Sequence, residues 1–365
     1  MKFGLFFLST YFPEVYGSVG NHMRRLVDFA VAGEDLGFDA VWANEHHFHP
    51  YGGHIPSVPV FLAAVAARTQ RIRLGSSVIV LPLHNPIEIA EQLAMVDLIS
   101  NGRVELCAGR GNVLGDFDVF GVSLQEAQAR TLEGLQVLRK AWTGRPFSHH
   151  GEFFHFENLE VWPKPQQEPH PPLWFPCSNN PESFAYAGEH GYRLLTVAQH
   201  RPVEELGDRV QVYLEAREKA GHGIDSAEVA THYQVFVDED GARAREVCEA
   251  ARERYDQLSA AARFQVPRAA AGIPVQTLID QGRVICGTPD ECIRQLEYAQ
   301  DVLGLTAADC NVLFGGMTYQ QAEHSMRLFA SKVIPALRTR QPTWRRRLLP
   351  PPPRWEREWV REPSA

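Results

Sequence analysis

Phe38-Asp39-Ala40-Val41-Trp42-Ala43-Asn44-Glu45-His46-His47-Phe48-His49-Pro50 is the stretch from which the fold of this chain is best inferred. Its first six residues are mostly apolar, which predicts a short buried strand. Its second half places an acid, three histidines and an aromatic side chain directly after that strand. Folds that alternate strands and helices carry their chemistry at the carboxyl ends of the strands. The stretch therefore predicts an α/β fold with a candidate site at residues 44–50.

The same unit of strand followed by helix occurs eight times along the chain. The expected strands cover residues 2–8, 38–43, 72–81, 103–108, 173–176, 192–197, 227–237 and 311–314. The expected helices cover residues 21–34, 58–68, 86–99, 124–142, 181–189, 203–219, 242–258 and 319–337. Such alternation requires parallel strands with right-handed crossovers. Eight units predict a (β/α)8 TIM barrel; an open doubly wound sheet, which usually has fewer units, is the alternative.

Two insertions and a tail interrupt this regular pattern. Residues 144–172 lie between helix 4 and strand 5, and residues 259–287 lie between helix 7 and strand 8. Long insertions in compact domains are typical of lids, so we expect residues 259–287 to form a lid or substrate loop over a barrel of residues 1–337. Residues 338–365 contain eight arginines and six prolines, which predicts a tail without its own core.

Composition and charge restrict the class of protein. The 365 residues are 44% hydrophobic and carry a net charge of -8, which argues against a general nucleic-acid binder. No apolar run approaches the roughly 20 residues that span a bilayer, and the N-terminus lacks the features of a signal peptide. The six cysteines are scattered without a CxxC pair, as is typical of a reducing compartment. We therefore expect a cytoplasmic protein that binds neither nucleic acid nor membrane.

The histidine cluster permits a metal site, a solvated turn or a catalytic role. His46 or His47, together with His49, offers two imidazole ligands, but a metal centre in a barrel needs further His or Asp ligands at other strand ends. Those strand ends are poor in carboxylates; they offer Ser76, Ser77, Arg110, Ser178, Asn179, Asn180, Gln199 and His200. We therefore expect no metal.

Two further segments are candidates for binding a phosphate. Arg110 stands between Gly109 and Gly111 after the fourth strand, where backbone N–H groups can approach an anion and the guanidinium can pair with it. Asn179, Asn180 and Ser183 stand at the start of the helix after the fifth strand, and helix N-termini bind phosphate readily. Each segment alone also fits an ordinary turn or helix cap. On adjacent strands they are expected to converge on one phosphate.

Four segments together resemble the bacterial luciferase-like flavin monooxygenases. They are Glu45 to Phe48, residues 75–82, residues 102–111 and residues 116–121, and the order and spacing match over about residues 1–335. The resemblance implies a (β/α)8 barrel that binds reduced FMN (FMNH2) supplied by a separate reductase or, in some branches, a deazaflavin.

The resemblance also implies roles for particular residues. His46 matches the histidine that faces the reacting edge of the flavin, with a role in acid/base chemistry and in hydrogen bonding to a flavin 4a-hydroperoxide. Arg110 matches the phosphate arginine, and Asn179, Asn180 and Ser183 fall where the family binds the same phosphate. Ser77-Val78 matches a non-prolyl cis peptide behind the isoalloxazine ring.

The chain departs from the luciferase pattern at two of these positions. Luciferase has an acidic residue where this chain has Asn179, and a reactive cysteine where it has Gly109. Cys107 lies two residues earlier, and we expect it to be a packed core thiol because free cysteines are usually buried. Light emission with a long aldehyde is therefore not expected.

The leading hypothesis is a two-component monooxygenase that uses reduced FMN and O2 to oxygenate a small organic substrate. A deazaflavin-dependent oxidoreductase that transfers hydride, and a non-catalytic flavin-binding subunit, are the alternatives. The family implies a homodimer formed through helices near strands two and three. A face of small residues on the second helix, Ala63, Ala64, Ala66 and Ala67, permits such close packing.

Overall fold

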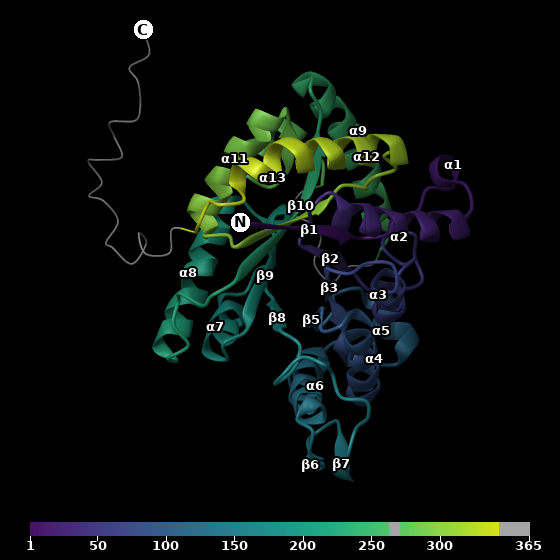
Figure 1. Ribbon diagram of the computed structural model, residues 1–365, viewed down its shortest axis with the longest axis vertical. Coiled ribbons are helices and arrows are strands. Elements are labelled where there is room, and N and C mark those ends of the chain that lie inside the picture. The colour runs from purple at the N-terminus through teal and green to yellow at the C-terminus, as the bar shows by residue number, and fades with distance from the viewer. Residues whose placement is uncertain (263–270, 343–365) are drawn as a thin grey trace.

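A closed barrel of parallel strands forms the centre of the computed structural model, which describes residues 1–262 and 271–342 (Figure 1). The predicted (β/α)8 fold is confirmed. In order around the barrel, the eight strands of the described chain are β1 (Lys2–Phe7), β2 (Ala40–Ala43), β3 (Arg73–Ser76), β5 (Val104–Gly109), β8 (Leu173–Pro176), β9 (Arg193–Val197), β10 (Val229–Val237) and β12 (Ala307–Asn311), which pairs again with β1.

Helices surround the barrel and connect successive strands. They are α2 (Val19–Asp35), α3 (Val58–Ala66), α4 (Pro86–Ser100), α6 (Ala127–Trp142), α7 (Pro181–Glu189), α8 (Val203–Lys219), α11 (Pro289–Leu303) and α12 (Tyr319–Leu328), which continues through a π-helical turn, η3 (Phe329–Val333), into α13 (Ile334–Leu337). The strands are buried on both faces because one side packs against these helices and the other fills the barrel.

The seventh and eighth units differ from the sequence expectation. The helix expected at residues 242–258 is α9 (Gly241–Ala261), but it lies at the carboxyl end of the barrel, where its Tyr255 hydroxyl hydrogen-bonds to that of Tyr51 at 2.7 Å. The helix that packs between α8 and η3 is α11, for which no helix was predicted. The inserted segment therefore begins earlier than expected and contains α9, α10 (Val275–Asp280) and β11 (Ile285–Gly287).

The eighth strand lies four residues before its expected position. It was expected at residues 311–314 and is β12, Ala307–Asn311. Asp309 and Asn311 hid it from a search for apolar runs, because both polar side chains are buried inside the barrel. The start of α11 did carry a signal, since Thr288 and Glu291 form a capping box with Pro289 in the first turn.

Two smaller details also differ from the prediction. The strand expected at residues 72–81 breaks into β3 and β4 (Ile79–Val80) at a cis peptide between Ser77 and Val78, as the family resemblance implied. The helix expected from residue 21 begins earlier, at Val19, because the Ser18 hydroxyl caps it by accepting a hydrogen bond from the Asn21 backbone N–H at 3.2 Å.

The insertion at residues 144–172 contains an antiparallel hairpin of β6 (Phe147–His150) and β7 (His155–Leu159). The Glu133 carboxylate of α6 fixes it by accepting hydrogen bonds from the backbone N–H groups of Phe153 and Phe154. Because the hairpin joins the end of a helix to the start of a strand, it lies toward the amino-terminal end of the barrel.

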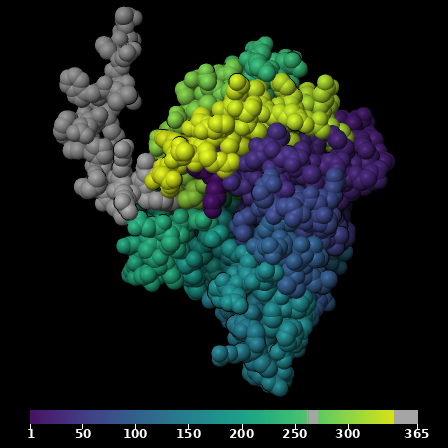
Figure 2. Space-filling model, viewed as in Figure 1, coloured from purple at the N-terminus to yellow at the C-terminus, as the bar shows by residue number. Residues whose placement is uncertain are grey.

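The two ends of the described barrel chain lie side by side. The Met1 ammonium group donates hydrogen bonds to the backbone carbonyls of Leu337, Arg338 and Arg340 at 3.1, 3.0 and 2.9 Å, and Figure 2 shows C-terminal residues of the barrel, in yellow, next to N-terminal residues, in purple. Most of the predicted tail, residues 343–365, and part of the predicted lid, residues 263–270, lie outside the described residues. No helix in the described ranges is long and apolar enough to cross a membrane.

Candidate active site

A cavity of about 480 Å³ opens at the carboxyl end of the barrel strands. Parallel strands end on the same side of a barrel, so residues far apart in the sequence meet there. Every site residue predicted from the sequence lines this cavity: His46, Ser77, Val78, Arg110, Gly111, Asn179, Asn180 and Ser183. The structure therefore brings the predicted set together, and the role of each member stays a prediction.

His46 lies in the loop after β2, and that loop is folded tightly. Phe48 has a φ of +59°, which is uncommon for an aromatic residue and reverses the chain after His47. Gly52 has a φ of +75°, and a Cβ atom there would come within 2.5 Å of the His46 Cδ2 atom. The His46 side chain is thus held between the cavity and the Gly52 backbone.

Glu45 anchors the same loop to the neighbouring strand. Its carboxylate accepts hydrogen bonds from His47 Nε2 at 2.9 Å, from His84 Nε2 at 2.7 Å and from the Val80 backbone N–H at 3.0 Å. Burial raises the pKa of Glu45, but these hydrogen bonds outweigh burial and lower that pKa to about 2. The hydrogen bonds of Glu45 therefore join the histidine loop to residues 80 and 84.

Replacement of Glu45 by glutamine is expected to destabilise the fold by about 3 kcal/mol, because it leaves two histidines and a backbone N–H around a neutral group. Chemical denaturation at pH 7 measures the loss. The matched control is Glu14→Gln, an exposed acid on α1 (Pro13–Tyr16) with no ion pair among those found in the described chain. Equal stability of the Glu45 variant and wild type would show that the network contributes nothing.

The floor of the cavity contains the cis peptide. The Ser77 carbonyl accepts a hydrogen bond from Asn44 Nδ2 at 2.6 Å, and the Ser77 N–H donates to the Ala43 carbonyl at 2.7 Å. A Cβ atom on Gly109 would lie only 3.0 Å from a methyl group of Val78. The glycine at this position therefore lets β5 approach Val78 closely.

A buried polar chain beneath the floor was missed by the sequence reasoning. The Ser77 hydroxyl is hydrogen-bonded to His232 Nε2, and His232 Nδ1 lies 3.3 Å from Asp309 Oδ2. The His232 ring stacks on Phe6 with 4.0 Å between the ring centroids. Burial raises the pKa of Asp309, and the neighbouring His232 opposes that shift. His232 lies within a correctly predicted strand, but every residue of β10 is buried, so its sequence pattern does not indicate which side chains face the barrel interior.

One corner of the cavity is rich in hydrogen-bond donors. Arg110 and Gly111 follow β5, and Gly111 has a φ of +74° with no room for a side chain, since a Cβ atom would lie 2.6 Å from Val80. Asn180 is the N-cap of α7, yet its side chain makes no capping bond. Asn179 Oδ1 accepts a hydrogen bond from Arg201 Nη2 at 2.9 Å, which adds a guanidinium near this corner. A helix N-terminus with guanidinium groups beside it is a set of donors that fits a phosphate group.

Cys107 is a packed thiol, as predicted. It is fully buried, and burial raises the pKa of its thiol well above the ordinary value. A buried thiol with a raised pKa is a poor nucleophile. Cys107 therefore belongs to the core.

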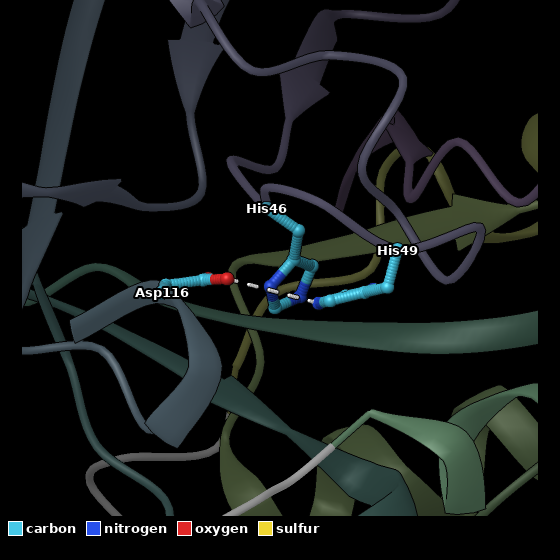
Figure 3. A group of neighbouring side chains, drawn as sticks. All are labelled: His46, His49 and Asp116. Atoms are coloured by element: carbon cyan, nitrogen blue, oxygen red, sulfur yellow. Dashed lines mark ion pairs between the residues drawn. The ribbon is translucent and has the colours of Figure 1, made fainter. Parts of the chain in front are cut away.

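Asp116 is a second residue that the sequence reasoning left without a role. It comes from α5 (Leu114–Phe120), a short helix after β5 that was not predicted, and its carboxylate approaches His46 and His49 (Figure 3). Burial raises the pKa of Asp116 to about 6. Asp116 is the first residue of the segment 116–121 that carries part of the family resemblance. Only the tertiary structure shows that its side chain lies next to the histidine loop and belongs to the cavity.

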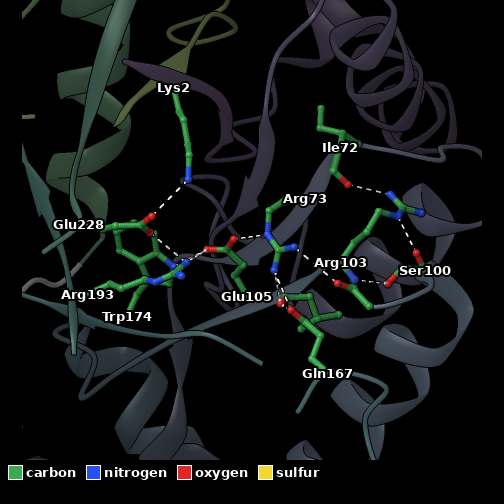
Figure 4. Close-up of polar contacts among 12 residues, drawn as sticks. Lys2, Ile72, Arg73, Ser100, Arg103, Glu105, Gln167, Trp174, Arg193 and Glu228 are labelled. Carbon is green, nitrogen blue, oxygen red and sulfur yellow. Dashed lines mark hydrogen bonds and ion pairs between the residues drawn. The ribbon is translucent and has the colours of Figure 1, made fainter. Parts of the chain in front are cut away.

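The opposite end of the barrel carries charges that are mutually satisfied. Glu105 pairs with Arg73 and hydrogen-bonds to Trp174, while Arg193 lies 3.0 Å from Glu228 (Figure 4). Polar groups at the amino-terminal end of such barrels contribute to stability, whereas the carboxyl end carries the chemistry. The cavity is therefore the better candidate for the active site.

The fold and the cavity define a (β/α)8-barrel enzyme whose site is built from the loops after β2, β3, β5 and β8. Residues 1–306 match the family described as luciferase-like monooxygenase, and the chain belongs to that family. Members of the family use either a flavin or the deazaflavin F420.

Three relatives illustrate the range of the family. The crystal structure of monooxygenase RslO1 from Streptomyces bottropensis is 30% identical with a TM-score of 0.85, over 92% of this chain and 99% of that one. The alkanal monooxygenase alpha chain of Photobacterium leiognathi is 29% identical over 87% of this chain and 94% of its own. The F420-dependent glucose-6-phosphate dehydrogenase of Amycolatopsis mediterranei is 28% identical over 86% of this chain and 95% of its own.

Proposed function

We propose that this protein is a two-component monooxygenase that uses reduced FMN and O2 to oxygenate a small organic substrate. The observation that carries the proposal is that one cavity contains both His46 and the donor-rich corner at Arg110 and the start of α7. That combination fits a flavin with a single terminal phosphate. The similarity to RslO1 and to the alkanal monooxygenase supports oxygenation as the reaction.

The bound flavin would supply the activation of O2, and the protein would supply binding, orientation and proton transfer. Arg110, Gly111, Asn179, Asn180 and Ser183 would hold the phosphate, and Ser77 and Val78 would support the ring. The His46 imidazole would donate or accept a proton at the reacting edge of the flavin. A separate reductase would deliver the reduced cofactor.

The inserted segment at the carboxyl end is proposed to exclude water from this cavity. Tyr255 of α9 lines the cavity, and its hydroxyl bonds to Tyr51 in the histidine loop. Closing an active site protects reactive species from water. Of the predicted lid, residues 259–262 and 271–287 are described; the first range includes the end of α9, and the second contains α10 and β11.

The main alternative is hydride transfer with a deazaflavin, which the similarity to the F420-dependent dehydrogenase favours. The decisive experiment compares binding of reduced FMN and reduced F420 without oxygen and then mixes each complex with air-saturated buffer. We expect tight FMN binding and an oxygen-dependent transient in the near-ultraviolet absorbance. Preferential F420 binding, with no such transient for FMN, would refute the monooxygenase proposal.

We further propose a homodimer formed through α3 and α4. Apolar side chains are exposed on these neighbouring helices, among them Val60 on α3 and Met95 and Ile99 on α4, which are 70%, 53% and 54% exposed. Exposed apolar groups gathered on one face are typical of an interaction surface. Of the small residues predicted for this face, Ala66 packs into the core while Ala64 and Ala67 are exposed.

Replacement of Val60 by lysine is expected to weaken dimerisation by at least about tenfold, because a charge would have to be buried at the interface. Sedimentation velocity over a range of protein concentrations measures the shift toward monomer. Val119→Lys is the matched control, since Val119 is 64% exposed and belongs to α5, which is not one of the two helices of the proposed interface. A monomeric wild type, or an equal effect of both substitutions, would contradict the proposed interface.

A cytoplasmic location is part of the same proposal. All six cysteines are free and buried in the structure. Free thiols persist in a reducing compartment, which is also where a reductase can supply reduced FMN. Fractionation of cells that express the tagged full chain would test this location.

A further inference from the structure

We propose that His46, His49 and Asp116 form a binding site for a divalent transition metal of the zinc class at the wall of the cavity. One ring nitrogen of each histidine and one carboxylate oxygen all lie within 4.8 Å of one another, and His49 Nε2 is 4.0 Å from Asp116 Oδ1. Figure 3 shows the three side chains pointing toward a common centre from the loop after β2 and from α5.

The fold of the histidine loop creates this convergence. The left-handed conformation of Phe48 turns the chain back, so the His46 and His49 rings lie with 5.5 Å between their centroids. Asp116 enters from a different strand end. The sequence argued against a metal because carboxylates are scarce directly after the strands. Asp116 supplies a carboxylate from α5 instead.

An independent observation is that several polar atoms of the group lack hydrogen bonds. Asp116 Oδ1 and both ring nitrogens of His49 are buried without a hydrogen-bond partner in the structure. The Asp116 side chain is only 4% exposed. Burying a carboxylate oxygen costs free energy unless a donor or a metal satisfies it. A cation at the centre of the group would satisfy Asp116 Oδ1 and one of the two His49 ring nitrogens.

The ligand chemistry selects the class of metal. Two imidazole nitrogens and one carboxylate oxygen suit Zn²⁺, Co²⁺ or Ni²⁺, whereas Mg²⁺ and Ca²⁺ prefer oxygen ligands alone. Bond lengths of about 2.0–2.2 Å place tetrahedral ligand atoms about 3.3 Å apart, so small side-chain rotations must close the site. His46 and Asp116 both line the cavity, so the remaining coordination position would face it.

Metal binding would have a consequence for turnover. A metal on His46 would remove the imidazole from proton transfer, so Zn²⁺ should inhibit the enzyme. This consequence rests on the proposed function, whereas the metal site itself does not. Measurements on flavin-free protein therefore distinguish failure of the metal site from failure of the proposed function.

The experiment titrates Co²⁺ into the full-length, flavin-free protein and follows the visible absorption bands of the bound ion, with Zn²⁺ calorimetry in parallel. We expect one ion per chain, and an affinity at least about tenfold lower in both His49→Ala and Asp116→Asn. Circular dichroism checks that each variant is folded, and either folded variant suffices to decide.

A second group of potential ligands provides the matched control. Asp238, Glu239 and His324 also lie within ligand distance of one another, but Glu239 and His324 are exposed. His324→Ala is expected to leave the Co²⁺ bands unchanged. Absence of Co²⁺ bands and Zn²⁺ heat up to millimolar metal would overturn the proposal. Wild-type affinity in folded His49→Ala or Asp116→Asn would overturn it equally.

Discussion

Replacement of His46 by asparagine is expected to lower the rate of substrate oxygenation by about 10²- to 10⁴-fold, the contribution typical of a positioned acid/base group. Asparagine retains a polar side chain of similar reach but cannot transfer a proton near neutral pH. His46 lines the cavity and packs against Gly52, where the smaller side chain creates no clash. The measurement is single-turnover oxygenation with saturating reduced FMN, which separates chemistry from cofactor binding.

The matched control for this prediction is His54→Asn. His54 contacts the Tyr11 ring, with 4.9 Å between the centroids, and it does not line the cavity. We expect its variant to turn over like wild type. A normal single-turnover rate in His46→Asn would exclude an acid/base role. If the rate fell only in step with the occupancy of reduced FMN, His46 would be a binding residue.

Replacement of Arg110 by methionine is expected to weaken FMN binding by about 10- to 150-fold, which corresponds to the roughly 1.5–3 kcal/mol of a hydrogen bond to a charged group. Methionine keeps much of the unbranched stem and removes the guanidinium. Fluorescence titration of the oxidised cofactor measures the dissociation constant. Because the start of α7 and Gly111 remain in place, some phosphate affinity should persist.

Riboflavin provides the control, since it lacks the phosphate and keeps the ring. The Arg110→Met variant should bind riboflavin with the wild-type dissociation constant. Equal weakening of FMN and riboflavin would place Arg110 away from the phosphate. Ser183→Ala should reproduce the same selectivity for FMN with a smaller effect, because it removes a neutral hydroxyl and not a charge.

The barrel could be predicted because its local signals are strong. Continuous apolar runs gave six of the strand positions closely, and α7 and α8 begin and end where the sequence places them. Prediction failed where polar residues face the barrel interior, as in β12, and where a helix leaves its usual layer, as in α9. The hydrophobic pattern of α9 indicates a helix, but no local pattern states which end of the barrel that helix covers.

The candidate site also contains residues that the sequence predicted and residues that it did not. Residues directly after a strand, such as His46 and Arg110, were found because the carboxyl end of a strand is a recognisable place in the sequence. Asp116 and His232 were not assigned, because one comes from a short helix and the other from the interior of a strand. Their importance depends on neighbours more than 60 residues away in the chain.

By itself, the sequence determined the repeated strand–helix unit, the closed barrel and the set of polar residues at the strand ends. It did so because hydrophobic periodicity and strand direction are local properties of the chain. Only the tertiary structure decided that Glu45 joins the loop to His84 and Val80, that α9 lies over the cavity, and that Asp116 meets His46 and His49. These contacts depend on how loops from different strands pack in space, and the sequence of one loop does not encode its distance from the other loops.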